Sequence, residues 1–185
     1  MTMGKDRGIV EIGAGNGQWA RALTERYEKF MGYDKSNDTA KRKRKKKTFD
    51  FVLAFDDQSE LPLDQSTFNK QTQIHHDFFF DNVQRCDSRN FSNTLRQWQC
   101  RGRILLLVYP PPGNMALDAV KQYASAAEMN DTVVYVGEGR GGANANDDFF
   151  AHLEHNGWSL MKIMKVKPLG SKGYEQLYIL QKSNC

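Results

Sequence analysis

The chain alternates short apolar runs with longer amphipathic stretches. Runs rich in β-branched or aliphatic residues, typical of buried strands, cover 8–12, 49–55, 103–109 and 132–136. The run at 103–109 is apolar throughout, which predicts a central strand that is covered on both faces. Prolines at 110–112 end this strand, because proline cannot donate to a strand ladder.

Other segments repeat apolar residues at helical spacing. In 18–27, Trp19, Leu23 and Tyr27 share one face, and 115–127 continues the pattern in a second helix. These periodicities predict two amphipathic helices that pack against a sheet.

The C-terminal part of the chain predicts one more helix and then a hairpin. Asp147 is the predicted N-cap of this helix, and Gly157 lies just past its end. The extended segments 158–166 and 175–181 flank a turn rich in proline and glycine, and a further short helix or strand is predicted at 78–83. The fold class is therefore α/β: a Rossmann-like, doubly wound, mostly parallel seven-stranded sheet with an antiparallel C-terminal hairpin.

The length of 185 residues suits a single domain, 1–185, with a basic insertion at about 28–48. No apolar run approaches the roughly 18 residues that a membrane span requires. No apolar signal region precedes the first strand, and three cysteines without a CxxC pair favour a reducing compartment. An intracellular location is the expectation, with cytoplasm, nucleus and organelle left open.

The positive charge is local. The net charge is +4, but residues 41–47, from Lys41 to Lys47, carry seven positive charges, without which the net charge would be −3. Such a tract is usually a solvated loop. A nuclear address or a contact with nucleic acid is the alternative.

The strongest motif is the glycine turn between the first strand and the first helix. Glycine stands at positions 13, 15 and 17, where the lack of a side chain lets the backbone approach a ligand closely. The helix that follows offers free N–H groups to a polar or anionic ligand. A dinucleotide-binding GxGxxG pattern would need glycine where Gln18 stands, and no phosphate-binding GxxxxGK[ST] motif is present. The turn therefore does not favour a dehydrogenase or a P-loop enzyme.

The segment Val10–Gly17, with the spacing Glu11-x-Gly13-x-Gly15-x-Gly17, resembles motif I of the class I S-adenosylmethionine-dependent methyltransferases. The order of the predicted elements agrees with that family over nearly the whole chain, including a terminal antiparallel hairpin. The chain also looks like a poorly characterised eukaryotic group of methyltransferase-like proteins. Its marks are a proline-rich end to the fourth strand and a Val-Gly-Glu-Gly segment after the fifth.

The resemblance implies S-adenosylmethionine as cofactor. Gly13, Gly15 and Gly17, with Ala14 between them, would pack under its methionine part. Glu11 would position its amino group.

An acid at the end of the second strand would accept hydrogen bonds from the ribose hydroxyls. Asp56, which is followed by Asp57, is preferred because its strand is the better one. Asp34 is the competitor, at a more usual distance from the turn. Asp87 would lie near the adenine. Two further residues, Tyr109 and Pro110, would border the cofactor at the end of the fourth strand.

The catalytic residues and the methyl acceptor are not identified by the sequence. Amino-group methyltransferases of this fold carry (Asp/Asn)-Pro-Pro-(Tyr/Phe/Trp) where this chain has 109–112, Tyr-Pro-Pro-Pro, so adenine or glutamine methylation is not supported. No histidine has companions at metal-ligand spacing, so no metal is expected. Besides an enzyme, two alternatives stay open: an inactive methyltransferase-fold subunit of a larger protein assembly, and a nucleic-acid-binding protein that uses 41–47.

Overall fold

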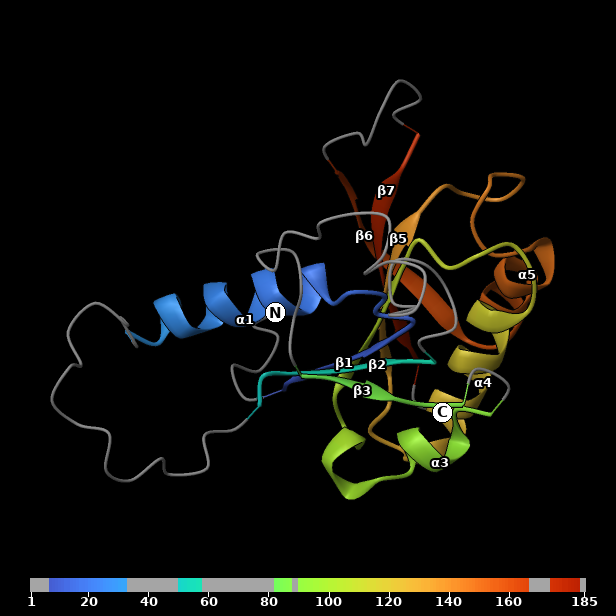
Figure 1. The fold of residues 1–185 in the computed structure, drawn as a ribbon. Helices are drawn as coiled ribbons and strands as arrows, with labels where there is room; N and C mark the ends of the chain where they lie inside the picture. The colour runs from blue at the N-terminus through green and yellow to red at the C-terminus, as the bar shows by residue number, and fades with distance from the viewer. Residues whose placement is uncertain (1–6, 33–49, 58–81, 88–89, 167–173, 184–185) are drawn as a thin grey trace, which may run out of the picture.

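The computed structural model describes residues 7–32, 50–57, 82–87, 90–166 and 174–183 (Figure 1). Asp34, the basic tract 41–47 and most of the predicted insertion at 28–48 lie outside these residues.

Within the described chain, a single seven-stranded sheet runs in the order β3-β2-β1-β4-β5-β7-β6 (Figure 1). The strands from β3 to β5 in this order pair in parallel, whereas β7 is antiparallel to β5 and to β6. The strands are β1 (Ile9–Ile12), β2 (Val52–Asp56), β3 (Val83–Arg85), β4 (Ile104–Val108), β5 (Thr132–Gly137), β6 (Trp158–Lys165) and β7 (Gln176–Lys182). This confirms the predicted α/β sheet and its antiparallel hairpin.

Helices cover both faces of the sheet. The helices are α1 (Gln18–Phe30), α3 (Ser92–Leu95), α4 (Met115–Ala126) and α5 (Asp147–His155), with a 3-10 turn η3 at Trp98–Cys100. Figure 1 shows α1 on one side of the sheet and the other helices on the opposite side. In the part of the chain that the structure describes, no helix has the length and apolar character to cross a membrane.

The larger hydrophobic core lies between the sheet and α4 and α5. In β4, Leu105 and Leu107 are completely buried and face this core, together with Val120 of α4 and Phe149 of α5. A smaller cluster on the other face joins Ala20 of α1 to β2. The strand β4 is therefore covered on both faces, which confirms the prediction made from its continuous apolar run.

Two local expectations need correction. The N-cap of α5 is Asn146, not Asp147, because the extended residue Asn146 accepts a hydrogen bond through Oδ1 from the Phe149 N–H at 3.0 Å. Asp147 instead belongs to the first turn, where its charge suits the positive end of the helix dipole. The third strand begins at Val83, where the predicted segment 78–83 ends, and 78–81 lie outside the described residues.

The outer strand β6 differs from the others in exposure. Only its first residue, Trp158, is buried, and Leu160, Met161, Ile163 and Met164 are each 43–52% exposed. The pairing with β7 shifts register between Leu160 and Lys162, which is the signature of a bulge.

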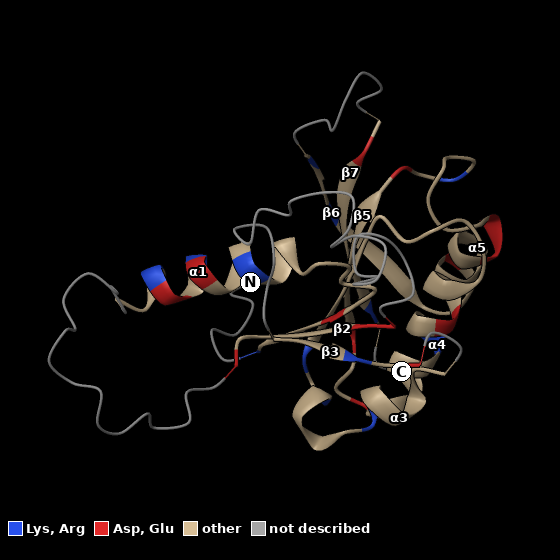
Figure 2. Cartoon of the chain, in the orientation of Figure 1, with Lys and Arg blue, Asp and Glu red and all other residues tan. Residues whose placement is uncertain are grey.

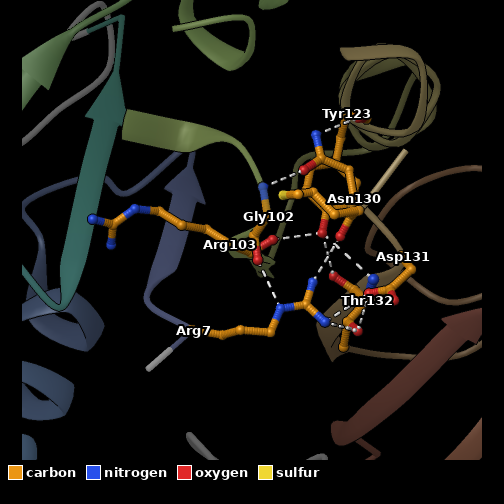
Figure 3. Close-up of polar contacts among 8 residues, drawn as sticks. Arg7, Gly102, Arg103, Tyr123, Asn130, Asp131 and Thr132 are labelled. Carbon is orange, nitrogen blue, oxygen red and sulfur yellow. Dashed lines mark hydrogen bonds and ion pairs between the residues drawn. The ribbon is translucent and has the colours of Figure 1, made fainter. Parts of the chain in front are cut away.

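At the amino edge of the sheet, Arg7 ties together the starts of three strands (Figure 3). Its Nε donates to the Gly102 carbonyl at 2.7 Å, and one terminal nitrogen donates to the Met129 carbonyl at 3.0 Å. The other terminal nitrogen lies 2.8 Å from the Asp131 carboxylate. Because Arg7 precedes β1 while these partners flank β4 and β5, its guanidinium joins segments that are far apart in sequence.

The fully buried Tyr123 hydroxyl completes this network from α4. It lies 2.6 Å from the Arg103 carbonyl and 3.1 Å from the Thr132 carbonyl. Asn130 accepts from the Gly102 N–H at 2.7 Å and donates to the Tyr123 carbonyl at 2.8 Å. The aromatic ring and its hydroxyl thus join α4 to the beginnings of β4 and β5.

We expect Tyr123→Phe to lower the free energy of unfolding by about 1–3 kcal/mol, because it removes the hydroxyl and leaves buried carbonyl oxygens without that donor. Urea denaturation followed by circular dichroism measures the change. Tyr174→Phe deletes the same atom from a tyrosine that is 71% exposed and should change the stability by less than about 0.5 kcal/mol. Equal effects of the two substitutions would contradict the structural role of Tyr123.

Candidate functional site

The predicted site residues lie at the carboxyl edge of the parallel strands. The glycine turn 13–17 follows β1, Asp56 ends β2, Asp87 lies just beyond β3, and Tyr109 follows β4. Since these strands are parallel neighbours, their ends meet at one edge of the sheet. Figure 2 shows acidic residues at the end of β2 on this edge.

The glycine turn needs glycine for two different reasons. Gly13, Gly15 and Gly17 have φ values of 74°, 56° and 76°, in the left-handed region that disfavours other residues. A Cβ at Gly13 would lie 2.5 Å from Cε of Met115, so this glycine accommodates the side chain that begins α4. A Cβ at Gly15 would meet no atom within 4 Å in the described part of the chain beyond its two sequence neighbours. The backbone at Gly15 therefore borders open space.

The glycine turn is bound directly to the end of β2. The N–H groups of Gly13 and Ala14 both donate to the Phe55 carbonyl, at 2.9 and 3.0 Å. The Gly15 N–H donates to Oδ2 of Asp56 at 2.8 Å, and Asp56 is only 9% exposed. The structure thus places Asp56 against the turn, with the half-buried Asp57 next to it.

Glu11 is a buried acid beneath this turn. Glu11 is 1% exposed, and within the described ranges its Oε2 has no hydrogen-bond partner. Burial raises the pKa of Glu11 to about 8; the Ala20 backbone N–H opposes this rise, and the charge of Asp56 adds to it. Glu11 is therefore largely protonated at neutral pH and holds an oxygen that lacks a donor.

The raised pKa of Glu11 predicts a pH-dependent stability. Between the usual value of 4.5 and about 8, the folded chain binds the Glu11 proton more tightly than the unfolded chain does. The free energy of unfolding should therefore fall as pH rises through this window, by at most about 4–5 kcal/mol. Urea denaturation from pH 5 to 8.5 measures the slope, and Glu11→Gln should remove this contribution. The same slope in both proteins would show that Glu11 does not titrate in this range.

Cys86 marks the acidic side of the edge. Burial raises the pKa of its thiol to about 12, and the charges of Asp56, Asp57 and Asp87 add to the rise in that order. The three carboxylates therefore all lie close enough to Cys86 to act on its thiol, and Asp87 is exposed to solvent. Such a cluster favours ligands that are cationic or donate hydrogen bonds.

Tyr109 has a strained backbone. Its φ is 47°, in the left-handed region, although it is not glycine, and its N–H donates to the Val136 carbonyl at 2.8 Å. Burial raises the pKa of its hydroxyl, and the charge of Glu175 raises it further. Pro110 is buried and accepts a hydrogen bond from the Ala145 N–H at 3.2 Å.

Hydrogen bonds connect the loops after β4 and β5. Asn144 accepts from the Glu138 N–H at 3.1 Å and donates to the Pro110 carbonyl at 3.4 Å. Asn146 donates to Oδ1 of Asn114 at 2.7 Å. The side-chain amides of Asn144 and Asn146 thus hold the loop after β5 against the loop after β4.

Sequence reasoning missed four residues of this edge: Cys86, Met115, Asn144 and Glu175. Cys86 comes directly after β3, and its place next to a strand end is a signal that could have found it. Met115 and Asn144 carry no such signal, because they reach the edge through tertiary contacts. Within the described ranges no group of three His, Cys, Asp or Glu residues could hold a metal ion.

Comparison with known sequences finds no matching family model and no matching curated protein. Comparison with solved structures finds a Streptococcus pneumoniae protein assigned as a tRNA (m1A22) methyltransferase, in complex with S-adenosylmethionine. The TM-score is 0.53 at 9% identity, and the alignment covers 98% of this chain and 70% of that chain. Another structure of the same Streptococcus protein gives a TM-score of 0.50 at 8% identity, with 97% of this chain and 66% of that chain covered.

These similarities establish the fold. The chain has the class I S-adenosylmethionine-dependent methyltransferase fold, as its motif and element order implied. The resemblance to one eukaryotic group within that class stays a prediction.

Proposed function

We propose that this protein binds S-adenosylmethionine and transfers its methyl group to an acceptor. The hydrogen bond between the Gly15 N–H and Asp56 Oδ2, beside the open space at Gly15, carries this proposal. It joins a backbone that a ligand can approach to a carboxylate that can bind a ribose. The methyltransferase fold supports the same conclusion.

The residues of the edge fit the chemical groups of this cofactor. A carboxylate at Asp56 can accept hydrogen bonds from two neighbouring hydroxyls, and Asp57 and Asp87 extend the acidic surface toward the base. The orphaned Oε2 of Glu11 lacks a donor that an ammonium group would supply. When bound, the cofactor supplies a methyl group activated by a positively charged sulfur.

The protein contributes binding and orientation. Gly13, Gly15 and Gly17 leave the backbone bare beside the ligand, and a positive charge near Glu11 would favour its ionised form. Tyr109 and Pro110 would border the reacting group from the end of β4. Methyl transfer requires a nucleophile placed in line with the methyl group, and holding both partners in that geometry is the main contribution of such a site.

Isothermal titration calorimetry with S-adenosylmethionine and with its demethylated product, S-adenosylhomocysteine, tests the binding step. We expect both compounds to bind. Absence of heat at millimolar ligand would overturn the proposed function. Binding without transfer to any acceptor would instead support the inactive-subunit alternative.

A further inference from the structure

Glu175 lies on the same edge, on the side of β4 away from Asp56. It directly precedes β7, whose first residue Gln176 pairs with Gly137 at the end of β5. In the neighbouring pair, Val108 of β4 faces Val136 of β5. Glu175 therefore lies two strands beyond Tyr109, whereas the acids expected to hold the adenosine part lie on the β2–β3 side.

The carboxyl group of Glu175 is incomplete in its hydrogen bonding. Its Oε2 is buried and has no hydrogen-bond partner among the residues that the structure describes. A buried acceptor without a donor costs about 1–3 kcal/mol, a cost that a hydrogen-bond donor on a ligand would offset. Tyr109 lies at the end of β4 on the same edge, where burial and the charge of Glu175 raise its pKa, and its left-handed backbone is the kind of strain that concentrates at ligand sites.

We propose that Glu175 is a positioning residue for the methyl acceptor, and that the acceptor reacts through a nitrogen or oxygen that carries a hydrogen. The carboxylate accepts a hydrogen bond from this N–H or O–H group, which lies beside Tyr109. This inference rests on the proposed function, because it assigns to the acceptor the part of the edge that the cofactor would leave free.

The hydrogen bond has a directional consequence. When an N–H or O–H group donates to Glu175, the lone pair of the same atom points away from the carboxylate and is free to face the methyl group. This lone pair would form the new bond to the methyl carbon as the bond from that carbon to sulfur breaks. S-adenosylhomocysteine would leave, and the proton of the acceptor would pass to solvent. Orientation of this kind is the main requirement of an in-line transfer. A carbon nucleophile or a thioether has no such hydrogen to donate and would leave Oε2 unsatisfied.

Transfer of tritium from methyl-labelled S-adenosylmethionine tests the acceptor class. Total RNA and total protein from cells that lack this chain serve as two separate acceptor pools. Digestion and mass spectrometry of the labelled pool then locate the methyl group. We expect it on nitrogen or oxygen, and a methyl group on carbon or sulfur would overturn the inference.

Glu175→Gln tests the residue, because it keeps the size of the side chain and removes the charge. We expect transfer to fall about tenfold, because the amide oxygen accepts a weaker hydrogen bond than the carboxylate does, while the Kd for S-adenosylmethionine stays within about twofold. Glu128→Gln makes the same change at an exposed residue before β5 and should leave transfer unchanged. Circular dichroism confirms that both variants fold.

A spectroscopic measurement tests the geometry without any turnover. The negative charge of Glu175 raises the pKa of Tyr109, so Glu175→Gln should shift the tyrosinate absorption of this residue to lower pH. The difference between the absorption titrations of wild type and Tyr109→Phe gives the part that belongs to Tyr109. An unshifted titration would show that the two groups do not face each other.

The outcomes separate the two proposals. If S-adenosylmethionine does not bind, the proposed function fails and the inference fails with it. If it binds but wild type labels neither pool, the transfer step of the proposed function fails and the inference fails with it. If wild type labels a pool and Glu175→Gln transfers normally, the inference alone is overturned. Weaker cofactor binding by Glu175→Gln would likewise overturn it and assign Glu175 to the cofactor.

Discussion

Gly15→Ala should weaken the binding of S-adenosylmethionine by about tenfold or more, a loss of at least about 1.4 kcal/mol, while the chain stays folded. The new methyl group enters the open space beside the turn. There it would meet no atom of the described chain, but it would clash with a bound ligand. The left-handed φ of 56° adds only about 1–2 kcal/mol of strain to folding. Isothermal titration calorimetry measures the affinity, and thermal unfolding measures the strain.

Gly157→Ala is the matched control for this prediction. Gly157 has a φ of 76°, and a Cβ there also meets no atom within 4 Å, but it lies between α5 and β6, where no predicted site residue occurs. Both substitutions should cost similar stability, and only the one at Gly15 should reduce ligand affinity. If the two variants bound S-adenosylmethionine equally well, the space beside the turn would not be the cofactor site.

Asp56→Asn should weaken the binding of S-adenosylmethionine about 10–150-fold. A charged acceptor contributes about 1.5–3 kcal/mol to each hydrogen bond that it accepts, and the amide keeps the shape but loses the charge. The bond from the Gly15 N–H can persist, because the amide oxygen of asparagine also accepts. Calorimetry with S-adenosylhomocysteine shows the same loss if the effect arises from the ribose, since the two compounds share it.

Asp50→Asn provides the comparison at the opposite end of the same strand. Asp50 is exposed and precedes β2, so the substitution Asp50→Asn makes the same change in net charge far from the glycine turn. The affinity of the Asp50→Asn variant for S-adenosylmethionine should match that of wild type. Equal weakening by both substitutions would attribute the effect to net charge and would remove Asp56 from the site.

Sequence patterns predicted the fold where local signals were strong. The all-apolar β4 and its terminating prolines gave a central strand, and the glycine spacing placed the turn between β1 and α1. The prediction that Asp56 lies at the end of a strand beside this turn depended only on the parallel arrangement, because parallel neighbours bring their carboxyl ends to one edge. The roles assigned to these residues stay predictions until ligand binding is measured.

Other features depend on contacts that no local pattern encodes. Met115 lies against Gly13 only because α4 packs onto the sheet near β1. Glu175 approaches Tyr109 through the reversal of the C-terminal hairpin, which sets the register of β7 against β5. The N-cap of α5 fell one residue from the expected position because asparagine and aspartate both suit that role, and only backbone geometry distinguishes them.

The last strand of the sheet has a consequence for the behaviour of the protein in solution. Lys162, which follows the bulge, and Lys165, at the end of the strand, stand among the exposed apolar side chains of β6. Ammonium groups and bulges on a terminal strand hinder the addition of foreign strands, because a second copy would bring its own lysines against them. Electrostatic repulsion between these lysines thus opposes the stacking of copies of the chain along β6. Concentrated salt screens this repulsion and therefore weakens its effect.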